Sequence, residues 1–272
     1  MMDFTSISDR GLVLLGCGKM GGAMLKGWLA KGLAPMSVSV VDPNPAPWLA
    51  DTGVSVNGAL PSDPAVIVVA VKPQMMAEAM PGQTGYGGGR TLFVSIAAGT
   101  RIATFEKMLG EGTPIVRAMP NTPAAIGRGI TAIVGNAVAS EAQVSLAEQL
   151  LAAVGQTVRL ESEDQMDAVT AVSGSGPAYV FHLIETLAAA GEAEGLPAEL
   201  ALELARTTVA GAGALAMEAE EDPGQLRVNV TSPNGTTAAA LEVLMDETRG
   251  FPALLKEAVH RAAERGRELG RQ

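Results

Sequence analysis

A glycine-rich turn near the start of the chain constrains the fold more than any other feature. The apolar run Leu12–Leu15 leads directly into Gly16-Cys17-Gly18-Lys19-Met20-Gly21, and an amphipathic segment containing Trp28 follows. In this strand–turn–helix context the first glycine permits a tight turn, the second lets a pyrophosphate approach the backbone, and the third lets helix and strand pack closely. The helix start adds amide donors and a partial positive charge. The segment therefore predicts a dinucleotide-binding unit; a glycine-rich turn without a ligand is the alternative.

An acidic residue ends the next predicted strand, Val38–Val41. At this place in dinucleotide-binding folds a carboxylate accepts hydrogen bonds from the adenosine ribose, which is the role we expect for Asp42. A 2′-phosphate would bring further negative charge beside Asp42, and residues 43–47 contain no Lys or Arg to offset the repulsion. The sequence therefore favours NADH over NADPH. The alternative is that Asp42 only starts a turn with Pro43.

Short apolar runs alternate with helix-like segments through the first half of the chain. Each run is rich in Val, Ile or Leu and is bounded by Gly, Pro, Asp or Asn, a pattern typical of buried parallel strands with helices on both faces. A helix is expected at residues 140–153, with Ser140 as its cap. The predicted strands are Leu12–Leu15, Val38–Val41, Val66–Val71, Leu92–Ile96, Ile115–Ala118, Thr131–Val134 and a weaker one at Thr157–Leu160.

Three loops follow predicted strands on the edge where open α/β sheets bind ligands. Ala70-Val71-Lys72-Pro73 places a lysine there, which either neutralises a cofactor phosphate or caps a helix end. Residues 95–99 and 117–123 supply small residues, Pro and Asn that suit a nicotinamide pocket, although ordinary loop structure would explain them as well.

The composition of the sequence changes after residue 162, where Ala-, Leu- and Glu-rich stretches replace the predicted strands. We therefore expect a Rossmann-type parallel-sheet domain at residues 1–162 and an all-α domain at residues 163–272. Val180, Leu183, Ile184 and Leu187 recur at helical spacing. A helical domain with so few aromatic residues buries its apolar faces internally or against a second copy, and the second possibility predicts a dimer. Further helices are expected at residues 197–220, 236–246 and 252–269.

Composition excludes several classes of function. The formal net charge of −10 argues against binding along a nucleic acid, since such binding relies on cations that neutralise phosphates. One cysteine and two histidines leave no set of side chains for a zinc cluster or disulfide, so no metal site is expected. No apolar run approaches the length of a membrane span, and the N-terminus is polar. We expect a soluble cytoplasmic protein with no membrane partner.

Two polar segments stand before predicted helices in the second half, at residues 173–179 and 231–237. In the second segment the amides of Gly235, Thr236 and Thr237 lie at a helix start, where unsatisfied donors and the helix dipole favour a carboxylate. The alternative is an ordinary hydroxyl-rich helix cap.

Taken together, these residues resemble one family, the pyrroline-5-carboxylate reductases. The match covers nearly the whole chain, and its most specific part runs from Leu226 to Leu244. The motifs that carry it are, in order, Gly16-x-Gly18-x-Met20-Gly21, residues 70–73, 95–99, 117–123 and 173–179, and Thr231-Ser232-Pro233-Asn234-Gly235-Thr236-Thr237. The resemblance implies reduction of 1-pyrroline-5-carboxylate to L-proline with NADH or NADPH, the last step of proline biosynthesis. It also implies a helical dimerisation domain and often a ring of dimers.

The resemblance also implies roles for particular residues. The pyrophosphate is held by Gly16, Gly18, Lys19, Met20 and Gly21. The adenosine side is contacted by Asn57, Ala70, Val71, Lys72 and Pro73, and the nicotinamide is bordered by Ala97, Met119 and Asn121. The substrate carboxylate is held by Gly235, Thr236 and Thr237, with Glu163 and Asn229 beside the substrate.

The sequence departs from the family pattern at Val228, where an acid is common, and at Asn234, where glycine is common. Asp42 also differs from the Ser, Thr or Asn of many NADPH-preferring members, which agrees with the preference for NADH inferred above. A protonated cyclic imine needs only to be bound, oriented and kept from water. No strong acid or base is visible at the expected site, so Thr237 is the candidate donor or proton relay to the ring nitrogen.

Two other functions would share part of this pattern. A β-hydroxyacid dehydrogenase shares this architecture but uses a lysine near the start of the helical domain, and no lysine occurs between Lys107 and Lys256. A cofactor-sensing module without turnover is the other rival, and it would bind NADH without oxidising it when imine is supplied.

Overall fold

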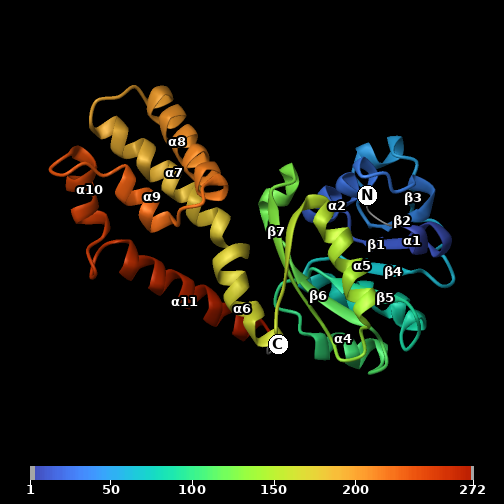
Figure 1. The fold of residues 1–272 in the computed structure, drawn as a ribbon. Coiled ribbons are helices and arrows are strands. Elements are labelled where there is room, and N and C mark those ends of the chain that lie inside the picture. Colours follow the sequence, from blue (N-terminus) through green and yellow to red (C-terminus); the bar gives the residue numbers. More distant parts are fainter. Residues whose placement is uncertain (1–3, 271–272) are drawn as a thin grey trace. The chain divides into compact units, whose positions relative to one another are not determined.

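The computed structural model describes residues 4–270, which form two compact units. The sheet unit contains the residues up to Gly174 together with those from Ala263 onward, and the helical unit contains Ser175–Ala262 (Figure 1). The change in composition placed the boundary at residue 162. In the structure, residues 163–174 and the end of the chain belong to the sheet unit.

An eight-stranded sheet with the order β3-β2-β1-β4-β5-β6-β7-β8 forms the centre of the sheet unit. Neighbouring strands are parallel except β6 and β7, which are antiparallel. Only residues 120–128 join these two strands, and a parallel crossover needs a longer connection. The two-residue β3 was not predicted. The strands are β1 Leu12–Leu15, β2 Val38–Val41, β3 Ser55–Val56, β4 Val66–Val69, β5 Leu92–Ser95, β6 Ile115–Met119, β7 Gly129–Gly135 and β8 Gly155–Arg159.

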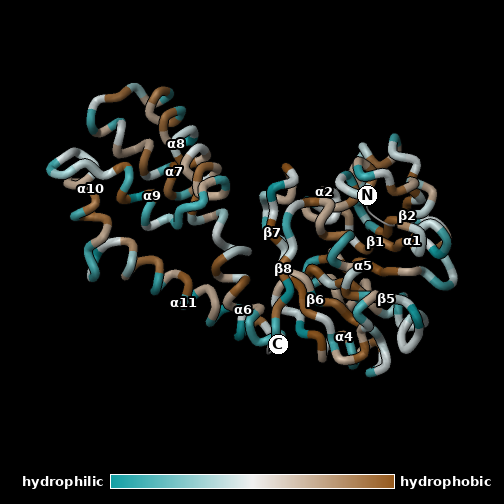
Figure 2. The backbone as a smooth tube through the Cα atoms, viewed as in Figure 1, coloured by the Kyte–Doolittle hydropathy of each residue, from teal (hydrophilic) through white to brown (hydrophobic). Residues whose placement is uncertain are grey.

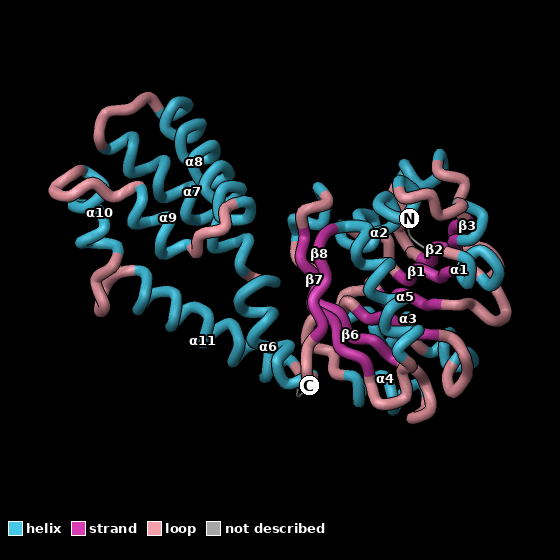
Figure 3. Tube along the Cα trace, viewed as in Figure 1, coloured by secondary structure: helices cyan, strands magenta, loops and turns pink. Residues whose placement is uncertain are grey.

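Helices cover both faces of this sheet (Figure 3). Side chains alternate along β1, so that Leu12 and Leu14 belong to one buried cluster and Val13 and Leu15 to the other. The first cluster includes Trp28, whose indole N–H donates to the Leu150 carbonyl at 2.8 Å. Figure 2 shows these strands as a hydrophobic band. The helices are α1 Thr5–Arg10, α2 Lys19–Ala30, α3 Met76–Ala79, α4 Ile102–Leu109, α5 Glu141–Leu151 and α6 Met166–Val169.

The predicted cap of α5 is confirmed. The Ser140 hydroxyl accepts from the Gln143 amide, and the Gln143 side chain accepts from the Ser140 amide, which together form a capping box. A π-helical segment, Thr170–Gly174, follows α6 and ends the sheet unit's main segment.

The helical unit contains α7 Gly176–Ala193, α8 Ala198–Glu218, α9 Pro223–Asn229, α10 Thr236–Leu244 and most of α11 Phe251–Leu269. Its small buried cluster consists of Ala188, Ala201 and Ala205, packed with Ile184 and Leu202. Among the described residues, α8 is also the one helix long and apolar enough to cross a membrane by length and composition alone, which is weak evidence by itself.

Candidate active site at the carboxyl edge of the sheet

The glycine-rich turn lies between the end of β1 and the start of α2. Gly16 has a φ of 86°, and a Cβ there would come within 2.9 Å of the Ala70 carbonyl oxygen. A Cβ at Gly21 would overlap the Gly16 carbonyl oxygen. Two of the three glycines are therefore required by close packing of backbone on backbone.

Gly18 differs from the other two, because nothing lies within 4 Å of the position its Cβ would take. Its φ of −69° suits any residue, so the fold itself does not require glycine there. Gly18 lines a cavity and is the N-cap residue of α2, so no side chain covers the helix-start amides there. The space that a Cβ would fill lies beside helix-start amides, which fits the pyrophosphate of a dinucleotide.

The cavity has a volume of about 980 Å³ and follows the carboxyl edge of the sheet from the glycine-rich turn toward β2 and β4. Eight of the residues expected to hold the cofactor line it. These are Gly16, Gly18, Lys19, Asp42, Asn57, Ala70, Val71 and Lys72. The other residues expected to hold the cofactor do not line this cavity; they are Met20, Gly21, Pro73, Ala97, Met119 and Asn121.

Asp42 is held firmly at the wall of this cavity. Its Oδ2 accepts from the Cys17 amide at 2.6 Å and its Oδ1 from the Asn44 amide at 2.8 Å. Asn57, which has a φ of 52°, donates its side-chain amide to the Asp42 carbonyl and accepts from the Asp42 amide. The bond to Asn44 is the turn foreseen as the alternative role of Asp42. Each carboxylate oxygen has a further lone pair for a ribose hydroxyl, so the turn and the binding role are compatible.

Several residues in the cavity wall were not foreseen. Lys26 lies with its Nζ 4.4 Å from the centre of the Trp48 ring, a cation–π contact. Lys19 and Lys26 are seven residues apart on α2, a spacing that places both on one helix face and could have revealed the second lysine.

The predicted Lys72 is exposed at the start of a short 3-10 segment, where its side chain makes no capping hydrogen bond.

Cys17 is buried in the glycine-rich turn. Burial, and then the neighbouring Asp42 carboxylate, raise the pKa of its thiol to about 11, with Lys26 acting in the opposite direction. A thiol in this state is a poor nucleophile, so a redox role finds no support.

Further along the same edge, Ala97 follows β5, and Met119 and Asn121 lie at the end of β6. The Ala97 amide donates to the Ser95 hydroxyl at 3.2 Å. Asn121 accepts from the Ile130 amide at 3.0 Å and donates to the Ser173 hydroxyl at 3.3 Å. The structure therefore brings a residue of the π-helical segment to the loop that the sequence assigned to the nicotinamide.

Glu163 makes a buried ion pair that the sequence did not reveal. Its Oε1 accepts from the Arg117 guanidinium at 2.7 Å and from the Ile102 amide at 2.9 Å. Arg117 is 4% exposed and Glu163 is 23% exposed. The pair connects β6, the start of α4 and the segment that leads into α6.

The other residues expected at the substrate belong to the helical unit. Gly235 caps α10 without a side-chain hydrogen bond, and Thr236 and Thr237 are its exposed first two residues. The start of α10 is therefore not the hydroxyl-capped end considered as the alternative. Asn229 ends α9, and its side chain accepts from Gln225 at 2.8 Å.

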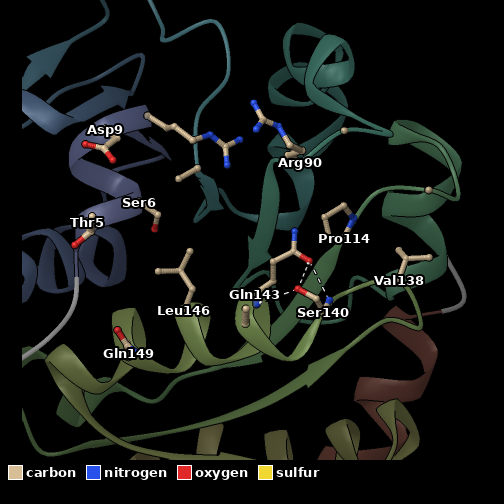
Figure 4. Close-up of a pocket in the computed structure, with 15 residues that line it drawn as sticks. Thr5, Ser6, Asp9, Arg90, Pro114, Val138, Ser140, Gln143, Leu146 and Gln149 are labelled. Atoms are coloured by element: carbon tan, nitrogen blue, oxygen red, sulfur yellow. Dashed lines mark hydrogen bonds between the residues drawn. The ribbon is translucent and has the colours of Figure 1, made fainter.

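A second cavity, of about 770 Å³, is bordered by residues that precede β4 and β6, at the opposite ends of the strands. Arg10 and Arg90 line it, and both guanidiniums already bind Asp63, at 2.8 and 2.6 Å. Figure 4 shows Ser140 and Gln143 hydrogen-bonded to each other at its wall. Because these polar groups have partners, the carboxyl edge is the better candidate for a ligand site.

A glycine-rich turn that leads into a helix start, with a carboxylate after the next strand at the carboxyl edge of a mainly parallel sheet, is the arrangement typical of Rossmann-type dinucleotide-binding proteins. Family models match residues 12–99 as "NADP oxidoreductase coenzyme F420-dependent" and residues 163–269 as "Pyrroline-5-carboxylate reductase dimerisation". A pyrroline-5-carboxylate reductase from Pseudomonas aeruginosa is 40% identical, covering 98% of this chain and 99% of that protein. The chain belongs to the pyrroline-5-carboxylate reductase family.

Solved structures agree with this assignment. A pyrroline-5-carboxylate reductase from Coxiella burnetii superposes with a TM-score of 0.88 at 34% identity, covering 96% of this chain and 98% of that one. A Plasmodium falciparum pyrroline carboxylate reductase with NADP bound superposes with a TM-score of 0.84 at 28% identity and the same coverage.

Proposed function

We propose that this chain reduces 1-pyrroline-5-carboxylate to L-proline at the carboxyl edge of the sheet, with NADH as its preferred hydride donor. The activity itself follows from the family: the chain is an NAD(P)H-dependent oxidoreductase of proline biosynthesis. The observation that carries the proposal is the cavity around Gly18 and Asp42, because it offers a cradle for a pyrophosphate next to an anchored carboxylate for a ribose.

The preference for NADH rests on charge. The Asp42 carboxylate would repel a 2′-phosphate and would accept from the ribose hydroxyls of NADH instead. Lys26 lies on the same cavity wall and supplies an opposing positive charge, but its Nζ is placed over the Trp48 ring. We therefore expect Asp42 to dominate the choice between the two cofactors.

Substrate binding is proposed to use the start of α10. The amides of Gly235, Thr236 and Thr237 would donate to the carboxylate of the imine, and the Thr237 hydroxyl would donate to its ring nitrogen. The bound cofactor supplies the hydride. The Thr237 hydroxyl would donate to the lone pair of the imine nitrogen before that nitrogen is protonated, and this hydrogen bond would orient the ring carbon that is reduced.

The first experiment follows oxidation of NADH and NADPH separately, with the imine supplied and proline identified as the product. We expect a higher kcat/KM with NADH, and a smaller NADH preference in Asp42→Asn. The matched control is Asp9→Asn, an exposed acid on α1, which should leave the preference unchanged. A preference for NADPH in the wild type would overturn the role given to Asp42, and NADH binding without turnover would overturn the proposed reaction.

A second variant tests the substrate site. Thr237→Ala should lower kcat/KM for the imine at least about tenfold, equivalent to ~1.4 kcal/mol of transition-state stabilisation. Cofactor affinity measured without imine should not change. Wild-type kcat/KM in this variant would remove Thr237 from the proposed mechanism.

Self-association is proposed for the helical unit. Phe181, Leu187, Leu200 and Leu204 on α7 and α8 are all exposed in the single chain. Apolar side chains of this number gain more by packing against a second copy than by facing water. We propose a homodimer in the cytoplasm, with a ring of dimers as its larger assembly, in which a second copy rather than a membrane covers the apolar face of α8. Sedimentation showing a monomer at micromolar concentration would contradict this assignment.

A further inference from the structure

The π-helical segment Thr170–Gly174 places Ser173 at the carboxyl edge of the sheet. π-Helical turns are rare and occur frequently at functional sites. The terminal methyl of Met119 lies 2.6 Å from the position that a Cβ at Gly174 would take, so the segment packs against the side chain that ends β6. The segment is therefore packed onto the loop that is expected to border the nicotinamide.

The Asn121 amide determines how the Ser173 hydroxyl is used. The Ile130 amide donates to Oδ1 of Asn121 at 3.0 Å, which fixes the orientation of the side-chain amide. Its Nδ2 must then donate, and it does so to the Ser173 hydroxyl oxygen at 3.3 Å. Because Ser173 is the acceptor in this bond, its own proton remains available for another acceptor.

Hydroxyl groups on helices commonly donate to a carbonyl one turn earlier, and Thr170 does this, to the Met166 carbonyl at 2.8 Å. Among the described residues of the sheet unit, 4–174 and 263–270, no carbonyl or other acceptor receives a hydrogen bond from the Ser173 hydroxyl. Ser173 is half-buried, and its hydroxyl oxygen already accepts from Asn121. Its O–H is therefore available to donate to a ligand.

The position of Ser173 along the sheet edge indicates which part of the ligand it meets. The glycine-rich turn follows β1, and Asp42 follows β2 on one side of it. Asn121 and Ser173 lie at β6, on the other side of β1 and beyond β4 and β5. A dinucleotide with its adenosine at β2 and its pyrophosphate at β1 extends its nicotinamide toward β5 and β6.

We propose that Ser173 donates a hydrogen bond to the carbonyl oxygen of the nicotinamide carboxamide, and that Asn121 is the positioning residue that orients the Ser173 hydroxyl for this purpose. The inference rests on the proposed use of a nicotinamide dinucleotide. It adds to the cofactor site a residue from the segment that follows α6.

The test compares two probes that differ at the nicotinamide. NADH and ADP-ribose share the adenosine and the pyrophosphate, but ADP-ribose has no nicotinamide. Binding of each is titrated by the fluorescence of the protein, since Trp48 lines the cavity. Ser173→Ala should weaken NADH binding about fivefold, the equivalent of one ordinary hydrogen bond, and leave ADP-ribose binding unchanged.

Three controls make the comparison specific. Ser173→Thr retains a hydroxyl and should restore NADH affinity. Ser145→Ala removes a hydroxyl on α5 that likewise accepts from a side chain, that of Arg159, and should change neither affinity. Asn121→Asp offers Ser173 an acceptor in place of a donor, so it should weaken NADH binding while the hydroxyl is still present.

Equal weakening of NADH and ADP-ribose in Ser173→Ala would show a structural role only and overturn the proposal. Unchanged affinity for both probes in that variant would also overturn it. Failure of the wild type to bind NADH would instead refute the proposed function on which the inference depends, so the two failures are distinguishable.

Discussion

The buried ion pair between Arg117 and Glu163 offers the most direct test of how the sheet unit is held together. Glu163→Gln keeps the shape of the side chain and an oxygen that can accept from the Ile102 amide, but it removes the negative charge. Arg117 is 4% exposed, so water replaces little of what its guanidinium loses. The variant leaves a buried cation without its counter-ion.

The magnitude follows from the geometry. Two unit charges at the observed 2.7 Å interact by about 6 kcal/mol at an effective dielectric constant of about 20, before desolvation is deducted. Removing one partner of a buried pair typically costs about 3–5 kcal/mol. Glu163 is 23% exposed and the Ile102 bond survives, so we expect a loss of about 2–3 kcal/mol. At about 2–4 °C per kcal/mol, Tm should fall by about 4–12 °C.

The assay is thermal unfolding followed by circular dichroism, with Glu148→Gln as the matched control. Glu148 pairs with Arg159 at 2.8 Å, but this pair is more exposed and Arg159 has Glu141 as a second partner. The control should lose less than about 1 kcal/mol. Equal changes in Tm for the two variants would refute the reasoning that burial makes the Arg117 pair the stronger one.

Three further predictions concern single residues. At pH 8 only about one in 1,000 Cys17 thiols should be ionised, against about one in four for an ordinary cysteine. A thiolate of higher pKa is intrinsically the stronger nucleophile, which offsets part of this difference, so Cys17 should react with a disulfide reagent at least about tenfold more slowly than a model thiol. Gly18→Ala should keep the wild-type Tm but lose NADH affinity, because the new Cβ would meet no protein atom. Gly21→Ala should lower Tm, because its Cβ would overlap the Gly16 carbonyl oxygen. Arg10, and then Arg90, hold the pKa of Asp63 below its usual value, so its stabilising contribution is present above about pH 4 and is lost as pH falls through the lower folded pKa. The difference in Tm between wild type and Asp63→Asn should therefore shrink in acid, and a constant difference would contradict this.

Much of the sheet could be predicted because its central strands β1, β4 and β5 are buried on both faces. Leu12–Leu15 is a continuous apolar run followed by Gly16, Val38–Val41 is a valine-rich run followed by Asp42, and both strands have the predicted bounds. The strand β7 was predicted, at Thr131–Val134, but its antiparallel direction was not, because an apolar run specifies a strand and not its direction. That direction depends on the length of the connection from β6 and on which sheet edge is free.

Part of the candidate site could likewise be predicted from the sequence. The glycine-rich turn and Asp42 are visible in the sequence, since a turn, a helix start and a strand end are local features with recognisable residues. The roles assigned to Gly235, Thr236 and Thr237 by resemblance remain predictions. Local chemistry of this kind, together with the order of the motifs, was sufficient to identify the fold class and the family.

Tertiary structure alone decided which distant side chains meet. Lys26 lies over Trp48, Arg117 binds Glu163, and Asn121 binds Ser173, although each pair is separated by more than twenty residues. No periodicity or spacing encodes such contacts, because they depend on strand order and on how the helices cross the sheet. The sequence by itself determined which chemistry the chain carries, and the packing of the sheet unit decided which atoms are positioned to use it.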